Sequence, residues 1–203
     1  MAIKIKKIDL RRIQFSIKGE SPLIQHAWSE KGKAQLRMTA QERKKVEKTK
    51  RDPEQSALDA TYFMPDGTTY GFPLLAFKAA LISAAHKDLG LEKTLLKKAF
   101  FIPCDNKDNL VPLKCTPPEV REDVVRIGAN QTDLRYRPEF KEWSVDIVAD
   151  VDFGSLTEEN LVNLINRAGF GVGVCEWRPE KGGEFGRFKI DESVPMTNET
   201  LEW

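Results

Sequence analysis

Alternating apolar and polar side chains mark the strands of this 203-residue chain. The clearest example runs from Trp143 to Phe153, where every second residue is apolar and most residues between them are polar or acidic. Ile13, Phe15 and Ile17 alternate with polar residues in the same way. Because successive side chains of a strand point to opposite faces of a sheet, we expect a half-buried strand at each place.

Two segments instead have the spacing of helices. The first opens at Pro73 and continues to Lys87, with apolar residues three and four positions apart and alanines that permit close packing on a sheet. The second covers 156–168, after a capping box at Ser155-Leu156-Thr157-Glu158. Gly169 is expected to end it.

Shorter signals complete the fold prediction. Strands are expected at 99–103, 110–113, 172–174 and 185–190, a hairpin at 62–70, and loop over most of 116–142. The order of elements, with strand–helix–strand occurring twice, predicts an α+β fold of ferredoxin-like type. This is a βαββαβ antiparallel sheet with helices on one face.

Charge is distributed unevenly along what we expect to be a single domain, 1–203. Nine Lys and Arg residues and two Glu lie between Lys31 and Arg51, whereas the tail 191–203 has four acids and no base. The segment 29–56 has few apolar residues, which is typical of a solvated helix or mobile insertion, partly helical. The other reading is a basic arm that grips phosphates. The net charge of +1 argues against polyanion binding over the whole surface.

Composition also bears on compartment and cofactors. No apolar run is long enough to span a membrane, and the N-terminus lacks the apolar region of a signal peptide. Three cysteines without close spacing indicate reduced thiols in a cytosol. Two histidines and these cysteines offer no chelating pattern, so we expect neither a metal nor a cofactor. Asp146, Asp150 and Asp152 share a strand face that either binds a divalent cation or is simply solvated.

The stretch 169–188 carries the strongest functional signal. Seven of its twenty residues are Gly or Pro, and it offers Trp177 for stacking and Arg178, Lys181 and Arg187 for phosphates. It matches neither the dinucleotide fingerprint nor a P-loop. Alternatively, it is a hairpin whose glycines serve turns and tight packing. Glutamates at 176, 180 and 184 weaken a phosphate cradle.

A second basic and aromatic group lies earlier in the chain. Arg126 and the run Arg135-Tyr136-Arg137 can clamp phosphates while the ring stacks on a base. Equally, these arginines can pair with nearby acids such as Asp133 and Glu139.

The strand 143–153, the helix 156–168, Gly169-Phe170-Gly171-Val172-Gly173 and Gly183-x-x-Gly186-Arg187-Phe188 together resemble the RAMP superfamily. So does Gly71-Phe72-Pro73 leading into a helix. These are crRNA-binding backbone subunits and crRNA-processing endoribonucleases of CRISPR systems. The resemblance covers about 70–190 and implies ferredoxin-like domains with RNA near the glycine-rich loop. The usual Ser-Arg-Gly of that loop is replaced here, and Ala79 stands where glycine is common.

Most of the chain also resembles a family of uncharacterised tailed-bacteriophage proteins. The shared layout is a charged arm, the Gly-Phe-Pro helix, Arg-Tyr-Arg-Pro and Glu-Trp-Arg-Pro-Glu. This resemblance implies a phage-encoded protein in the cytoplasm of a prokaryotic host.

These observations lead us to expect a non-catalytic, self-assembling protein of RAMP-like type that binds single-stranded RNA or DNA. The expected contacts are Lys31, Lys33, Arg37, Arg43, Lys44, Lys45, Arg126, Arg135, Arg137, Trp177, Arg178, Lys181 and Arg187. One alternative is a phage protein–protein interaction module, or an inhibitor of a host defence complex. The other is a metal-independent endoribonuclease that uses His26 as general acid or base. With no visible partner in the sequence, His26 can also simply pack beside Trp28.

Overall fold

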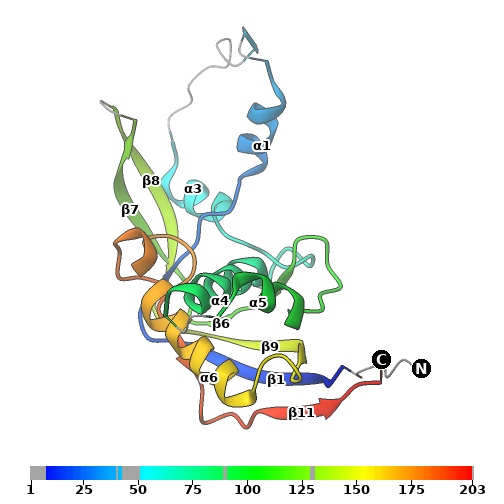
Figure 1. The fold of residues 1–203 in the computed structure, drawn as a ribbon. Helices are drawn as coiled ribbons and strands as arrows, with labels where there is room; N and C mark the ends of the chain where they lie inside the picture. Colours follow the sequence, from blue (N-terminus) through cyan, green and yellow to red (C-terminus); the bar gives the residue numbers. More distant parts are fainter. Residues whose placement is uncertain (1–7, 40, 43–50, 89–90, 129–130, 203) are drawn as a thin grey trace, which may run out of the picture.

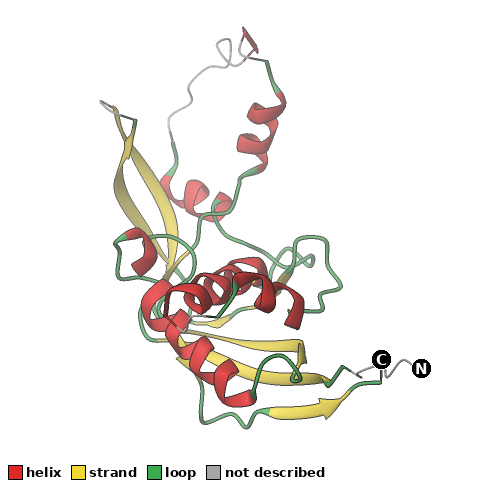
Figure 2. Cartoon of the chain, in the orientation of Figure 1, coloured by secondary structure: helices red, strands yellow, loops and turns green. Residues whose placement is uncertain are grey.

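The computed structural model describes residues 8–39, 41–42, 51–88, 91–128 and 131–202. The architecture is α+β, and all strand pairs are antiparallel (Figures 1 and 2). The strands form a six-stranded, a three-stranded and a two-stranded sheet. None of the described helices is both long and apolar enough to cross a membrane.

Two long strands form the centre of the main sheet. β1 (Leu10–Gly19) pairs with β9 (Trp143–Asp152) over nine consecutive residue pairs. Shorter strands complete both edges, giving the order β10-β1-β9-β4. On the β1 side lie β10 (Phe188–Ile190) and β11 (Thr197–Thr200), and on the β9 side lie β4 (Phe100–Phe101) and β6 (Lys114–Cys115).

Helices cover one face of this sheet, as the alternation predicted. The helices are α4 (Leu74–Asp88), α5 (Lys93–Ala99) and α6 (Glu158–Arg167). Every second residue of β9 is buried, and Ile13, Phe15 and Ile17 of β1 are buried with them. The Phe77 ring of α4 lies 6.2 Å from the Phe15 ring and 5.6 Å from the Phe188 ring. The predicted strands at 13–17 and 143–153 and the helix from Pro73 are therefore confirmed.

Both predicted ends of the second helix are wrong. Thr157 rather than Ser155 caps α6, because its side chain accepts from the Asn160 N–H. At the other end the chain continues beyond Gly169 in a π-helical turn, Ala168–Val172, so the strand expected at 172–174 is absent. A β-carbon at Gly169 would overlap the Phe188 carbonyl, which means that close packing on β10, rather than a helix stop, requires this glycine.

The expected loop at 116–142 is also wrong, because β7 (Glu119–Ile127) and β8 (Gln131–Phe140) form a long hairpin there. β2 (Leu23–Ile24) pairs with the base of β8, and the hairpin extends away from the main sheet (Figure 1). One of its faces carries alternating Arg and acidic side chains instead of apolar ones. The alternation of apolar and polar residues that marks a strand is therefore weak in the hairpin segment, which explains why the strands were not predicted.

The charged insertion is partly helical, as expected. Its helices are α1 (Glu30–Arg37) and α3 (Pro53–Asp59), whereas Arg43, Lys44 and Lys45 lie outside the described residues. Asp52 caps α3 by accepting from the Glu54 and Gln55 N–H groups. α3 packs on β8. β3 (Gly71–Pro73), which directly precedes α4, pairs with β5 (Leu110–Pro112) in a separate two-stranded sheet.

Candidate functional site

Arg137 of β8 lies buried at the base of the hairpin. Its side chain is 6% exposed and its Nη1 donates to Asp123 Oδ2 at 3.2 Å. Asp123 is itself 8% exposed and also accepts from Arg121 Nε at 2.8 Å. The Arg137 Nη2 reaches Glu176 Oε2 at 3.8 Å, while its buried Nε has no hydrogen-bond partner. This arginine, expected to clamp phosphate, instead holds carboxylates of its own chain.

Glu176 connects the glycine-rich stretch to the rest of this cluster. Its N–H donates to the Ile24 carbonyl at 3.0 Å, and its carboxylate lies 3.6 Å from His26 Nδ1. The hydrogen bond from His26, followed by the charges of Arg137, His26 and Arg178, lowers the pKa of Glu176. His26 thus has a carboxylate partner that the sequence could not reveal, since 150 positions separate the two residues.

The thiol beside this cluster has a raised pKa. Burial, with a contribution from the Glu176 charge, raises the pKa of Cys175 to about 12. The thiol therefore stays protonated at neutral pH. Burial likewise raises the pKa of Tyr62, which lies near the same Cys175 and Glu176.

The glycine-rich stretch closes on its own backbone. Phe185 N donates to the Trp177 carbonyl at 3.0 Å, and Val174 N donates to the Gly186 carbonyl at 2.9 Å. A β-carbon at Gly183 would overlap the Trp177 carbonyl, so this glycine serves close packing. The glycines therefore serve turns and tight packing, as the alternative interpretation expected. The stretch is not a hairpin, however, because strand structure within 169–188 begins only at Phe188.

Three side chains of this closed loop are exposed, those of Trp177, Lys181 and Glu184. Trp177 has a positive φ of 51° and remains 39% exposed. Lys181 is exposed at the end of the short 3₁₀ helix η2 (Pro179–Lys181). A rigid backbone that presents an indole and a nearby ammonium can stack on a base and contact a phosphate.

The remaining arginines of the stretch have internal partners. Arg178 lies 3.2 Å from Glu180 Oε2 and donates to the Cys175 carbonyl at 3.1 Å. Glu180 also accepts from the Ser83 hydroxyl of α4 at 2.6 Å. Arg187 stacks 5.0 Å over the ring of Phe170, and both line a surface recess of about 260 Å³.

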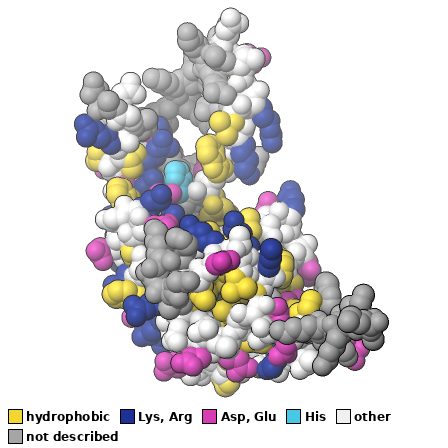
Figure 3. Space-filling model, viewed as in Figure 1, with side chains coloured by type: hydrophobic (Ala, Val, Ile, Leu, Met, Phe, Trp, Pro, Cys, Tyr) yellow, Lys and Arg dark blue, Asp and Glu magenta, His cyan; other side chains and the backbone are white. Residues whose placement is uncertain are grey.

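Basic side chains of the hairpin and the arm occupy the upper half of the molecule in Figure 3, and acidic ones concentrate along its lower edge. Arg135 pairs with Asp133 at 3.1 Å, and Arg51 pairs with the same carboxylate at 2.6 Å. Arg126 is exposed on β7, and Lys33 and Arg37 are exposed on α1. Nothing is described of the side chain of Lys31.

A second exposed tryptophan was missed. Trp28 is 64% exposed and packs against the start of α1 near Gly32. It follows His26 by two residues, and Trp177 directly follows Glu176, so the backbone positions that carry the two indoles both lie close to the His26–Glu176 contact. A tryptophan directly before a highly charged segment was the available signal, because a segment with few apolar residues offers little surface to bury an indole.

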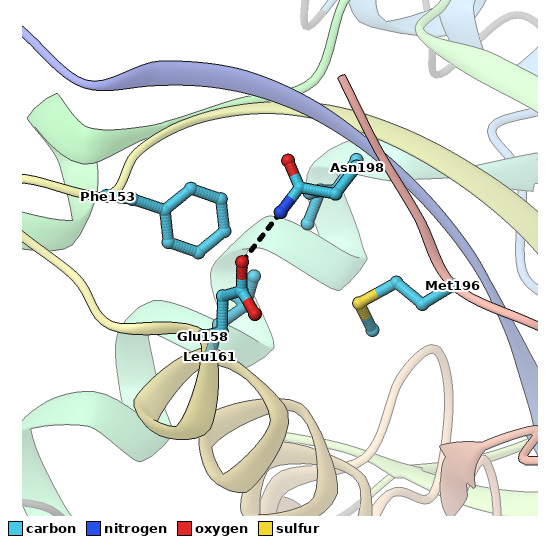
Figure 4. A pocket seen from close by; sticks show the side chains of 6 residues that line it. Phe153, Glu158, Leu161, Met196 and Asn198 are labelled. Carbon is cyan, nitrogen blue, oxygen red and sulfur yellow. Dashed lines mark hydrogen bonds between the residues drawn. The ribbon is translucent and has the colours of Figure 1, made fainter. Parts of the chain in front are cut away.

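Two other kinds of site, a ligand pocket and a metal site, find less support on the described surface. The recess in Figure 4 lies between β11 and α6, has a volume of about 140 Å³, and is crossed by a 2.6 Å hydrogen bond from Asn198 Nδ2 to Glu158 Oε1. It is too small for a typical ligand pocket. No described group of three His, Cys, Asp or Glu residues can hold a metal ion. Asp146 and Asp150 instead pair with Lys114 at 2.6 Å and Arg12 at 2.7 Å.

Removal of Arg137 tests the buried cluster. We expect Arg137→Met to lower the free energy of unfolding by about 3–5 kcal/mol, because Asp123 would stay buried with its charge less compensated. The double variant Asp123→Leu/Arg137→Met should lose less than the single one. Arg135→Met is the matched control and should cost less than about 1 kcal/mol. Urea unfolding measures all three, and equal losses for the two single variants would contradict the assignment.

The lowered pKa of Glu176 predicts a pH dependence. A folded-state pKa below the ordinary 4.5 means that the unfolded chain binds more protons in this range. The stability that Glu176 supplies is therefore present above pH 4.5 and lost as the pH falls through the folded-state pKa. Melting temperatures between about pH 3 and pH 6 should decline less steeply in Glu176→Gln than in the parent. Glu184→Gln makes the same change at an exposed side chain of the same stretch and serves as the matched control.

Comparison with known proteins identifies no family for this chain. No protein-family model matches it, and a search of curated proteins returns no match. The resemblances to RAMP and bacteriophage proteins thus stay predictions, and the interpretation of the site depends on its own geometry.

Proposed function

We propose that this protein binds single-stranded nucleic acid without catalysing a reaction on it. The observation that carries the proposal is the pair of exposed indoles, Trp28 and Trp177, beside a fixed His26–Glu176 contact. Bases stack on exposed indoles whatever their sequence, and each stacked base contributes about 1–3 kcal/mol. Two such platforms close together suit neighbouring nucleotides of an unpaired strand.

Exposed cations that could contact phosphates follow each tryptophan along the chain. Lys181 is exposed four residues after Trp177, and Lys33 and Arg37 are exposed on the helix that follows Trp28. The proposed path is narrower than the sequence suggested, because Arg135, Arg137 and Arg178 are held by carboxylates. It passes from Lys181 over the two indoles to α1, whose following residues include Arg43, Lys44 and Lys45.

We further propose the ferredoxin-like topology for the main sheet. The order β10-β1-β9-β4 supports it, since all neighbours are antiparallel. α4 lies in the chain between β1 and β4, and α6 lies between β9 and β10. With the hairpin and arm as additions, the strands and helices follow the βαββαβ order. The same order underlies the resemblance to RAMP proteins.

Binding of labelled single-stranded RNA and DNA, followed by fluorescence anisotropy at low salt, tests the proposal. Trp28→Ala and Trp177→Ala should each weaken binding about 5- to 150-fold, through the loss of one stacked base. Lys181→Ala should weaken binding of all sequences and reduce the slope of log affinity against log salt by about 1.

Phe101→Ala removes an exposed aromatic residue of β4 and serves as the matched control. It should bind as the parent does. Undetectable binding of either nucleic acid at low salt, or tryptophan variants that bind like the Phe101 variant, would end the proposal.

The His26–Glu176 contact also favours a second candidate, a metal-independent endoribonuclease. A carboxylate can orient an imidazole for general acid–base catalysis. Under our main proposal the parent leaves RNA intact in EDTA. Cleavage by the parent that disappears in His26→Ala would replace the binding function with the nuclease. Phe101→Ala again provides the control for purity of the preparation.

A further inference from the structure

β7 presents an open edge. The order of its sheet is β2-β8-β7, so no described strand pairs with the outer side of β7 (Figure 1). Its nine residues pair one to one with β8, from Glu119↔Glu139 to Ile127↔Gln131, without a bulge. The strand contains neither proline nor lysine. Proteins protect edge strands by such devices and also by charged side chains, five of which β7 carries. This long regular edge is therefore suited to pair with a strand whose charges complement its own.

The outward face of this strand is partly apolar. Val124 is 68% exposed, and Leu134 lies directly across from it on β8, also exposed. Val120 is exposed further along the same face. Arginine and hydrophobic side chains lie together on the hairpin in Figure 3. Apolar side chains on an unpaired edge gain most if a second strand covers them.

The sequence of β7 is complementary to itself in the antiparallel direction. Val124 has Glu122 two positions before it and Arg126 two positions after it, all three on one face. If two copies pair antiparallel about Val124, each Glu122 faces the Arg126 of the other copy, and the two Val124 side chains meet on the twofold axis. This arrangement forms two ion pairs and one apolar pair.

The opposite face of the strand is compatible with the same register. There Asp123 would face Val125 of the second copy, and Arg121 would face Ile127. The charge of Asp123 is already compensated by Arg121 and Arg137. Hence no like charges meet across the new edge on either face.

We infer that β7 is a dimerisation strand, which pairs antiparallel with β7 of a second copy of this chain about a twofold axis at Val124. The product is a continuous sheet of two hairpins, β8-β7 of one copy and β7-β8 of the other. The interface is isologous, which is the commonest symmetry of soluble homo-oligomers. Backbone hydrogen bonds supply affinity, and the two Glu122–Arg126 pairs fix the register.

Charge reversal on the full chain, without nucleic acid, tests this pairing. Light scattering over a concentration series should show a reversible dimer for the parent. Glu122→Arg should raise the dimer dissociation constant about tenfold or more, because two attractive pairs become repulsive, and Arg126→Glu should do the same. The double variant Glu122→Arg/Arg126→Glu should restore dimerisation, since both pairs re-form with reversed sign.

Mixing the two single variants gives the sharpest result. One copy would then carry two arginines and the other two acids on the paired edge, so heterodimers should form where each variant alone is monomeric. Glu192→Arg makes the same change of charge outside the hairpin and should leave dimerisation unchanged. Circular dichroism establishes that every variant is folded.

A parent that stays monomeric at its highest soluble concentration overturns the inference. So does a double variant that dimerises no better than the single ones. Because the measurement uses no nucleic acid, its failure is distinct from failure of the proposed binding function.

Discussion

The buried charge of Arg137 holds three separate parts of the chain in one place. A guanidinium away from water is tolerated only where carboxylates surround it. Asp123 from the neighbouring strand and Glu176 from the glycine-rich stretch fill that role. The hairpin, β2 and the glycine-rich stretch therefore meet at a charged junction that adjoins the apolar core, where Leu23 and Phe140 are buried.

This junction also places the groups that remain exposed. Glu176 is fixed by Arg137 on one side and by His26 and the Ile24 backbone on the other. Trp177 and Trp28 are the next large side chains along their segments. Two of the acids that weakened a phosphate cradle at the level of sequence, Glu176 and Glu180, thus have a structural role, because they contact Arg137 and Arg178. The indoles of Trp28 and Trp177 remain exposed.

Periodicity predicted the parts of the fold that a single hydrophobic core determines. β1, β9 and α4 all bury one regular apolar face, and each was located from sequence. The hairpin was missed because one of its faces carries charge pairs such as Arg137–Asp123, which have no hydrophobic period. The π-helical turn at 168–172 was missed because it depends on the approach of Phe188, a contact distant in sequence. For the site, residue type identified Trp177 and Lys181. Only the folded structure distinguishes them from the predicted arginines Arg135, Arg137 and Arg178, which are paired with carboxylates of the same chain.

The outer edge of β1 is covered by two independent pieces, β10 and β11, with residues 191–196 between them. β10 contributes the buried Phe188 to the core, whereas all four residues of β11 are exposed. Segments with few buried apolar contacts open at a small fraction of the global unfolding free energy. The C-terminal strand therefore depends on its backbone pairing with β1 and on the Asn198–Glu158 hydrogen bond rather than on core packing. We expect the outer edge of Arg11–Gln14 to become accessible to amide exchange before the rest of the sheet unfolds.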